Sequence, residues 1–483
     1  MRNRFLLLGC VLVIAMGSIA VPFPDGAIAV LVVAILSAVA IFIFRRFTEE
    51  KDFITNVFLV GLALRMAFGI FVHVFELREF FGGDARAYDI YGSLLADTWL
   101  GHPAADGLTL QIEGTGGTGW GMYYFTGAIY TLLGRNIFAA QSICAVIGAA
   151  TAPMVYFCAN KVVGNLKVAK VAAIAIAVFP SFVIWSGQLL KDGLIIFLLV
   201  LIMTMILQLQ EKVNYLAIAL LVFSLFGIMS LRFYILYIVL VAIVGSFIVG
   251  ANTSNKSMLR RAFVLVLLGV SAVYFGVGRN ASTEIRVFGN LERIQSSRSD
   301  LAHAADSGYG EDVDVSTTSG ALAALPLGFT YLMFAPFPWQ ASNLRQAITI
   351  PEVLLWWAMM PLLISGLIYV VKYRLRSAFP ILIFSLLLTI AYSLFLGNVG
   401  TAYRQRTQIQ VFLFILIGVG WTIYKEKQED KKLTRGNAQR RVESQKQSQI
   451  EPKARPKFPY DDDIEDKKGQ EKIHITPEDD NDE

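Results

Sequence analysis

The chain contains little of what a soluble domain uses to fold and to bind charged partners. Only 16% of its 483 residues are charged, against roughly 25% in soluble domains. It has three cysteines and four histidines, and no C-x-x-C or H-x-x-H spacing occurs among them. The sequence therefore indicates no disulfide framework and no structural metal site. We also find no nucleic-acid-binding signal in it.

Apolar residues are abundant instead, at 55% of the chain, and they come in long blocks. Residues 1–424 are mostly such blocks, whereas residues 425–483 contain almost no large apolar side chain. A soluble fold could not bury so much apolar surface, so a bilayer must solvate it. We therefore predict an all-α, polytopic membrane protein with a disordered cytoplasmic tail.

The apolar blocks predict about twelve transmembrane helices, because a helix needs about 20 apolar residues to cross the hydrocarbon core. Two further apolar stretches, 119–134 and 320–338, are short or rich in glycine and proline. We expect them to form helices on the membrane surface, although either could be a true span. The twelve candidate spans are 5–21, 26–44, 53–77, 137–160, 168–187, 190–210, 214–230, 233–250, 262–278, 351–371, 378–396 and 407–424.

Lysine and arginine are concentrated in alternate loops between these spans, which predicts the orientation of the protein. We assign the basic loops to the cytoplasmic side of a bacterial inner membrane, which places both termini in the cytoplasm. The long segments 78–136 and 279–350 then lie on the periplasmic or extracellular side, where we expect the active site. The basic residues are Arg45, Arg46, Lys51, Lys161, Lys167, Lys170, Lys212, Lys256, Arg260, Arg261, Lys372, Arg374 and Arg376.

These predictions divide the chain into five parts. Residues 1–52 form an extra N-terminal transmembrane hairpin, and residues 53–278 form a transmembrane core that includes the first outer loop 78–136. Residues 279–350 form a long outer loop with a surface helix. Residues 351–424 form the C-terminal transmembrane helices, and residues 425–483 form the tail.

The first candidate site follows the third span, in the sequence Gly-Gly-Asp84-Ala-Arg86-Ala-Tyr88-Asp89. Asp84 would lie where lipid meets water, and partial desolvation there would make its carboxylate a better proton acceptor. The alternative is that Asp84 only caps a surface helix, which aspartate does well. We predict Asp84 as a catalytic base, with Arg86, Tyr88 and Asp89 as substrate-binding residues.

Further charged residues lie close to the predicted outer ends of other spans. Lys191 and Asp192 begin one span, Arg232 separates two others, and Arg404 and Arg406 precede the last one. Ionisable residues at such positions are candidates for function, and arginine matches phosphate oxygens well. The alternatives are a snorkelling lysine that pairs with its neighbour and arginines that anchor the helices to lipid headgroups. We predict all five as substrate-binding residues.

One base and several cations suit a reaction in which an anionic lipid is the leaving group. A sugar carried on a polyprenyl phosphate fits that description. Asp84 would take a proton from an acceptor hydroxyl that attacks the anomeric carbon. The arginines and Lys191 would stabilise the departing phosphate.

Several segments in order along the chain strengthen this interpretation. Asp84 is followed four residues later by Tyr88, and a predicted surface helix contains Trp120-Gly-Met-Tyr-Tyr-Phe. A Leu-Gly-Arg-Asn-Ile-Phe-Ala-Ala segment then leads into a span from Leu133, and Pro180 ends the next span. Over roughly 78–210, the chain resembles the GT-C superfamily of membrane glycosyltransferases, in particular the branch of protein O-mannosyltransferases and bacterial aminoarabinose transferases.

The resemblance implies a GT-C-like fold with amphipathic surface helices in the first outer loop. It also implies an inverting reaction, a lipid-phosphate sugar donor and Asp84 as the base. The chain departs from the family pattern in two respects. Ala85 stands where the family usually has an acidic residue, and the catalytic loop follows the third span rather than the first. The extra hairpin 1–52 explains the second departure.

We therefore predict a glycosyltransferase of cell-envelope glycan or exopolysaccharide synthesis, with a glycan, lipid or protein as acceptor. No cofactor is predicted. Some superfamily members use a divalent metal, but only Asp84 and Asp89 are visible here as possible ligands. A polysaccharide polymerase or O-antigen ligase is the first alternative, although such enzymes lack a first-loop catalytic aspartate. A transporter is the second, although we find no internal repeat of the kind that transporters often show.

Overall fold

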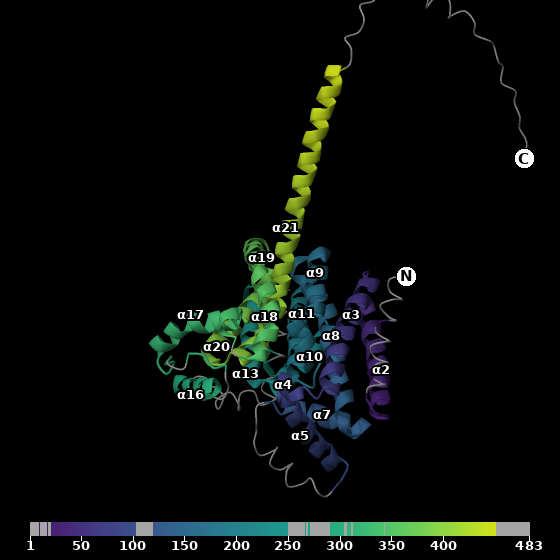
Figure 1. The fold of residues 1–483 in the computed structure, drawn as a ribbon, viewed down its shortest axis with the longest axis vertical. Helices are drawn as coiled ribbons and strands as arrows, with labels where there is room; N and C mark the ends of the chain where they lie inside the picture. The colour runs from purple at the N-terminus through teal and green to yellow at the C-terminus, as the bar shows by residue number, and fades with distance from the viewer. Residues whose placement is uncertain are drawn as a thin grey trace, which may run out of the picture. The chain divides into compact units, whose positions relative to one another are not determined.

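The computed structural model describes residues 21–102, 119–249, 290–303, 307–310, 313–341 and 343–450, with isolated positions at 9, 17, 266, 269 and 270. Every regular element in this part of the chain is helical, which confirms the all-α prediction (Figure 1). In chain order the helices are α2 Asp25–Arg45, α3 Lys51–Val74, α4 Arg78–Gly82, α5 Asp84–Trp99, α7 Gly121–Leu133, α8 Ile137–Val163, α9 Leu166–Val178, α10 Pro180–Ser186, α11 Lys191–Glu211, α12 Tyr215–Leu231, α13 Phe233–Val249, α16 Leu291–His303, α17 Thr318–Phe334, η1 Pro338–Gln340, α18 Leu344–Ala358, α19 Met360–Tyr373, α20 Leu375–Phe395 and α21 Val399–Ile450.

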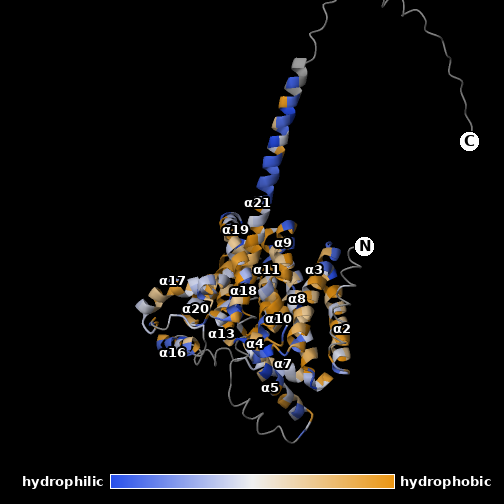
Figure 2. Ribbon diagram, in the orientation of Figure 1, coloured by the Kyte–Doolittle hydropathy of each residue, from blue (hydrophilic) through white to orange (hydrophobic). Residues whose placement is uncertain are grey.

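Several of these helices are long and apolar enough to cross a membrane, as a multi-pass membrane protein requires. Among the described residues there are six such helices, or up to eight candidate spans if each of two bent helix pairs counts as one. The predicted number of about twelve is therefore not confirmed. The candidate spans 5–21 and 262–278 lie almost wholly outside the described residues. Figure 2 shows the apolar character of the helices and the hydrophilic character of α16 and of the far part of α21.

Two other predicted spans are short helices in the structure. Helices α12 and α13 have 17 residues each, which gives a length of about 26 Å. The hydrocarbon core is roughly 30 Å thick. The break between them is at Arg232, whose φ of −151° and ψ of 88° are not helical.

Prolines break two further predicted spans. The predicted span 168–187 consists of α9 and α10, which meet at 54°, and the span 351–371 belongs to α18 and α19, which meet at 43°. Proline lacks an N–H group and cannot donate the hydrogen bond that links a helical residue to the preceding turn. Accordingly Pro180 is the first residue of α10, and a proline also lies in the first turn of α19.

Arg65 satisfies the backbone groups that the break at Pro180 leaves without a partner. The guanidinium of Arg65 donates to the carbonyls of Ile176 and Ala177, at 3.2 and 3.1 Å, and to the hydroxyl of Ser186 at 2.7 Å. Ile176 is four residues before Pro180, so its carbonyl has no helical donor. The buried Arg65 therefore holds α3 against the broken helix, which is a structural role.

Asparagine and threonine side chains begin several of the helices, as the N-cap preference predicts. Asn136 accepts a hydrogen bond from the backbone N–H of Ala139 at 2.8 Å and so caps α8. The same helix ends at Gly164, whose φ of 72° lies in the left-handed region that favours glycine. The other capping side chains are Asn165 on α9, Asn214 on α12, Thr317 on α17 and Asn343 on α18.

Helices α8 and α11 form the centre of the packed part of the chain, and most of their residues are buried. The sequence of α8 is rich in alanine and glycine, which lets neighbouring helices approach closely. Helix α2 lies at the edge, and apolar side chains such as Leu31 and Phe42 are about 60% exposed there. An exposed apolar surface of this kind suits contact with lipid.

The basic loops that predict the orientation meet at one end of the helices. Lys170 pairs with Glu50 at 2.8 Å, and Lys161 pairs with Glu211 at 2.9 Å. The hydroxyl of Ser377 donates to the backbone carbonyl of the residue after Lys161, at 2.7 Å. Four of the five basic loops are thus in contact, and the fifth, 256–261, lies outside the described residues.

Helix α21 extends far beyond the last predicted span. The sequence predicts disorder from residue 425 onward, whereas the structure continues the helix to Ile450. Lysine, glutamate, glutamine and arginine dominate this stretch, and all are good helix formers that need no core to form a helix. Residues 451–483 lie outside the described part of the chain.

Helix α19 approaches α21 so closely that only glycine fits at Gly366. A Cβ atom at this position would lie 1.9 Å from the backbone carbonyl oxygen of Leu416. We expect Gly366→Ala to lower the free energy of unfolding by about 1–3 kcal/mol, the usual cost of overpacking. Thermal unfolding in detergent would measure this. Gly436→Ala on α21 is the control, since nothing lies within 4 Å of its Cβ position, and an unchanged melting temperature of Gly366→Ala would contradict the contact.

Candidate active site

A chain of ion pairs joins four segments that are far apart in the sequence. The guanidinium of Arg404 donates to the carboxylate of Asp84 at 2.8 Å and to that of Asp192 at 2.7 Å. Arg232 donates to the other oxygen of Asp192 at 3.4 Å. Arg404 therefore connects the start of α5 to the start of α11, and Asp192 connects Arg404 to the break between α12 and α13.

The exposed fraction of the side chains rises from Asp192 to Asp84 along this chain of ion pairs. The side chain of Asp192 is fully buried, Arg232 and Arg404 are 8% and 16% exposed, and Asp84 is 50% exposed. A buried carboxylate requires compensation by paired charges, and two arginines provide it for Asp192. Asp192 is therefore placed to orient the arginines, whereas Asp84 is open to an incoming molecule.

The position of Asp84 does not support the reading that it only caps a helix. The N-cap of α5 is Gly83, no side chain caps this helix end, and Asp84 is the first helical residue. A negative charge in the first turn is favourable next to the positive end of the helix dipole. The carboxylate itself contacts Arg404, which lies 320 residues further along the chain.

Lys191 and Tyr88 complete this group. Lys191 lies close enough to Asp84 and Arg232 to interact with both electrostatically, and its Nζ atom lies beside Gly119, where a Cβ atom would be only 2.8 Å away. Tyr88 is buried, and burial, together with nearby Asp84, raises the pKa of its hydroxyl well above the ordinary value. We name Asp84, Tyr88, Lys191, Asp192, Arg232 and Arg404 the ionic cluster.

Three of the predicted site residues lie elsewhere. Asp89 accepts hydrogen bonds from Arg135 and from the hydroxyl of Tyr130, each at 2.6 Å. Burial alone would raise the pKa of Asp89, but these two donors lower it below the ordinary value. Arg86 forms an exposed ion pair with Glu79. Both residues thus have partners outside the ionic cluster.

Arg406, the third, is fully buried and faces a helix end. It donates to the backbone carbonyls of Met333 and Ala335, at 3.0 and 2.9 Å. These carbonyls lie at the C-terminus of α17, where the next residue is Pro336 and the helix cannot continue. Arg404 and Arg406 on α21 therefore differ in role, because residues two apart point to different sides of a helix. Arg404 belongs to the ionic cluster, whereas Arg406 donates hydrogen bonds to the end of α17.

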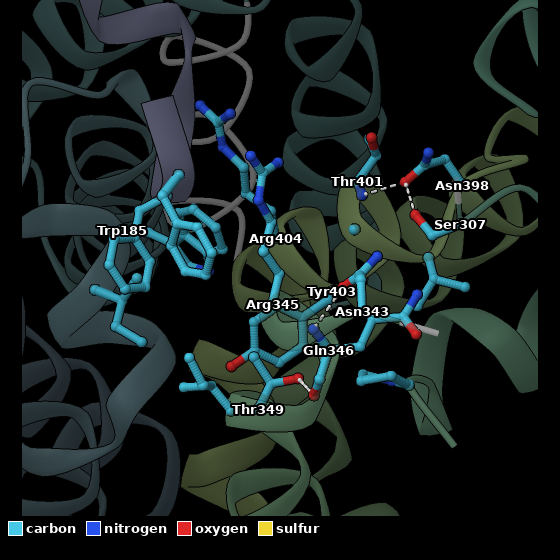
Figure 3. A pocket seen from close by; sticks show the side chains of 17 residues that line it. Trp185, Ser307, Asn343, Arg345, Gln346, Thr349, Asn398, Thr401, Tyr403 and Arg404 are labelled. Carbon is cyan, nitrogen blue, oxygen red and sulfur yellow. Dashed lines mark hydrogen bonds between the residues drawn. The ribbon is translucent and has the colours of Figure 1, made fainter. Parts of the chain in front are cut away.

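A cavity of about 480 Å³ lies next to Arg404 (Figure 3). Its wall combines the aromatic rings of Trp185 and Tyr403 with hydroxyl and amide side chains, and it contains a second arginine, Arg345. The guanidinium of Arg404 lies 5.5 Å from the centre of the Trp185 ring, which is close enough for a cation–π contact. Trp185 is thus held at the edge of the ionic cluster.

Sequence reasoning did not identify the carboxylate behind the cavity wall. Glu352 on α18 is buried and accepts a hydrogen bond from the hydroxyl of Tyr403 at 2.7 Å and another from the hydroxyl of Ser181. A glutamate within an apolar run is a signal that could have indicated it. Arg345 gave no comparable signal in the sequence, because it falls in the segment 279–350 that was predicted to be a long outer loop, although it belongs to α18 in the structure.

The structure offers no obvious metal centre in the part of the chain that it describes. No group of three or more histidine, cysteine, aspartate or glutamate side chains there is arranged to hold a metal ion. Cys144 and Cys158 are buried and form no disulfide.

Comparisons with known proteins leave the class of the protein open. No family model, no curated protein and no solved structure matches the chain.

Proposed function

We propose that the chain is a membrane glycosyltransferase that transfers a sugar from a polyprenyl-phosphate donor to an acceptor hydroxyl, in cell-envelope glycan or exopolysaccharide synthesis. The observation that carries this proposal is the contact between Asp84 and Arg404 within the ionic cluster. It joins an exposed proton acceptor to a cation that is itself held by a buried carboxylate. An arrangement of this kind suits charge stabilisation and proton transfer, and ionisable residues at a membrane are candidates for function.

The charge balance of the ionic cluster supports an anionic leaving group. Arg232, Arg404 and Lys191 outnumber the two carboxylates by one, which leaves a net positive charge beside Asp84. A phosphate that develops charge as it departs would be stabilised there by cations that are already in place. Because Asp192 keeps Arg404 oriented before substrate arrives, little reorganisation is needed during the reaction.

The proposed reaction is a single displacement. The acceptor oxygen forms a bond to the anomeric carbon while the bond from that carbon to the phosphate oxygen breaks. The bonding electrons leave with the polyprenyl phosphate, and the proton of the acceptor hydroxyl passes to Asp84. Arg404 and Lys191 bind the released phosphate.

The location of the ionic cluster relative to the basic loops supports a site on the outer side of the membrane. Helix α11 has 21 residues, so its ends lie about 30 Å apart, which is the thickness of the hydrocarbon core. The basic loops meet at its Glu211 end, and the ionic cluster is at its Lys191 end. If the basic end faces the bacterial cytoplasm, the reaction takes place on the periplasmic or extracellular side.

The proposal can be tested with the full chain reconstituted in liposomes. We expect it to consume at least one member of a panel of radiolabelled polyprenyl-phosphate sugars and to release polyprenyl phosphate when an acceptor extract is added. A polymerase or ligase would instead use a lipid-diphosphate donor, and a transporter would move a solute without breaking a bond. Consumption of lipid-diphosphate sugars alone, or of no donor, would contradict the proposal.

A further inference from the structure

Arg345 is a cation of the cavity wall that has no carboxylate partner in the part of the chain that the structure describes. None of the ion pairs among the described residues includes it. Its guanidinium lies 5.2 Å from the centre of the Phe80 ring and donates to the backbone carbonyl of Glu79 at 3.3 Å. These contacts hold Arg345 against α4, directly before Asp84, and neither of them is with a carboxylate.

Arg404, the other arginine of the cavity, differs in this respect. Two carboxylates, Asp84 and Asp192, already share its charge. An anion that enters the cavity can therefore bind Arg345 without displacing any carboxylate of the described residues. The two arginines line the same cavity (Figure 3), so a ligand bound at Arg345 would extend toward the ionic cluster.

The remainder of the wall suits a sugar. Thr349 and Thr401 contribute hydroxyl groups, and Trp185 contributes a large aromatic surface. Polar groups of this kind fix the orientation of a hydroxylated ligand, while the ring covers its apolar face. The volume of about 480 Å³ falls within the range of about 300–1,000 Å³ that is usual for small-molecule sites.

We propose that this cavity binds an anionic sugar, with Arg345 as the residue that binds its phosphate or carboxylate group. The inference rests on the proposed function and extends it, because it names the chemical class of a substrate. The anionic group has two possible sources, since it belongs either to the phosphate of the donor or to an acidic sugar of the acceptor. Both use the same chemistry at Arg345, and the test below separates them.

The test uses three ligands that differ mainly in charge, namely glucose 1-phosphate, glucuronic acid and glucose. Binding to the purified full chain in detergent would be measured by calorimetry. We expect one of the two anions to bind, and to bind at least tenfold more tightly than glucose. Preference for the phosphate would assign the cavity to the donor, and preference for the carboxylate would assign it to an acidic acceptor. Glucose binding as tightly as both anions, or no binding of either anion, would overturn the proposal.

The role of Arg345 is tested with Arg345→Gln. Loss of one charge-assisted hydrogen-bonding group should weaken binding of the anion by about 10- to 100-fold and leave that of glucose unchanged. Arg376→Gln is the matched control, because Arg376 is an exposed arginine at the start of α20 that does not line the cavity. Equal anion affinity in Arg345→Gln and wild type would overturn the assignment. The comparison of the three ligands with the wild-type protein needs no variant and stands even if Arg345→Gln fails to fold.

These outcomes are separable from the fate of the proposed function. Asp84→Asn should reduce sugar transfer by at least about 10²-fold but preserve anion binding, since Asp84 does not line the cavity. If transfer is never found but anions bind through Arg345, the cavity assignment stands and the glycosyltransferase proposal does not. If transfer is found but Arg345→Gln binds anions and transfers sugar as the wild type does, the glycosyltransferase proposal stands and the assignment of Arg345 does not.

Discussion

Asp84→Asn should reduce sugar transfer by roughly 10²- to 10⁴-fold, the usual contribution of a general base, without unfolding the protein. Asparagine has nearly the same shape and can still accept a hydrogen bond from Arg404, but it cannot take a proton from the acceptor hydroxyl. The side chain is half exposed, so the melting temperature should change little. Initial rates of transfer in liposomes, together with thermal unfolding, would measure both effects.

Asp97→Asn is the matched control for this experiment. Asp97 lies on the same helix α5, is about half exposed and pairs with His102 rather than with a member of the ionic cluster. We expect Asp97→Asn to transfer sugar at the wild-type rate. If Asp84→Asn did the same, Asp84 would not be the base, and the polymerase or ligase reading would become the better one.

The second large effect is expected at Asp192, and it concerns stability as well as activity. Asp192→Ala would leave the guanidiniums of Arg232 and Arg404 without their buried counterion. Removal of one partner from a buried ion pair typically costs about 3–5 kcal/mol, because the remaining charge stays buried. We therefore expect a much lower melting temperature and no transfer activity even at temperatures where the variant remains folded.

An exposed ion pair provides the comparison for Asp192→Ala. Glu79 pairs with Arg86, and both side chains are more than 70% exposed. Glu79→Gln should change the free energy of unfolding by less than about 1 kcal/mol, as is usual for surface pairs. If Asp192→Ala were no more destabilising than Glu79→Gln, the ionic cluster would not be the rigid, buried arrangement described above.

Much of the helical architecture could be predicted from hydropathy, because several of the apolar blocks have the length of a helix that crosses the bilayer. The breaks were harder to predict. The apolar runs around Pro180 and Pro361 look continuous by composition, yet each proline removes one backbone donor and bends the helix pair. In the tail beyond residue 424 the sequence predicts disorder, whereas the structure continues the helix to Ile450. Good helix formers can form a helix without a hydrophobic core.

The candidate site was predictable in part. Charges at the ends of apolar runs are costly, and this cost indicated Asp84, Asp192 and Arg404. The same argument also selected Arg406, whose guanidinium instead satisfies carbonyls at the end of α17. The free-energy cost of placing a charged side chain at the membrane does not by itself distinguish a residue that binds substrate from one that donates hydrogen bonds to the last carbonyls of a helix. That distinction depends on which segments meet in space, and so Arg345 was not identified from the sequence.

The configuration of the product tests the central claim most directly. A single displacement with Asp84 as base must invert the anomeric carbon, so the new glycosidic bond should have the configuration opposite to that of the bond in the polyprenyl-phosphate donor. Proton NMR of the product formed by the reconstituted protein would show this from the coupling constant of the anomeric proton. An inverted product that Asp84→Asn forms roughly 10²- to 10⁴-fold more slowly than the wild type is the predicted result. A product with retained configuration, or an inverted product that Asp84→Asn forms at the wild-type rate, would contradict the account.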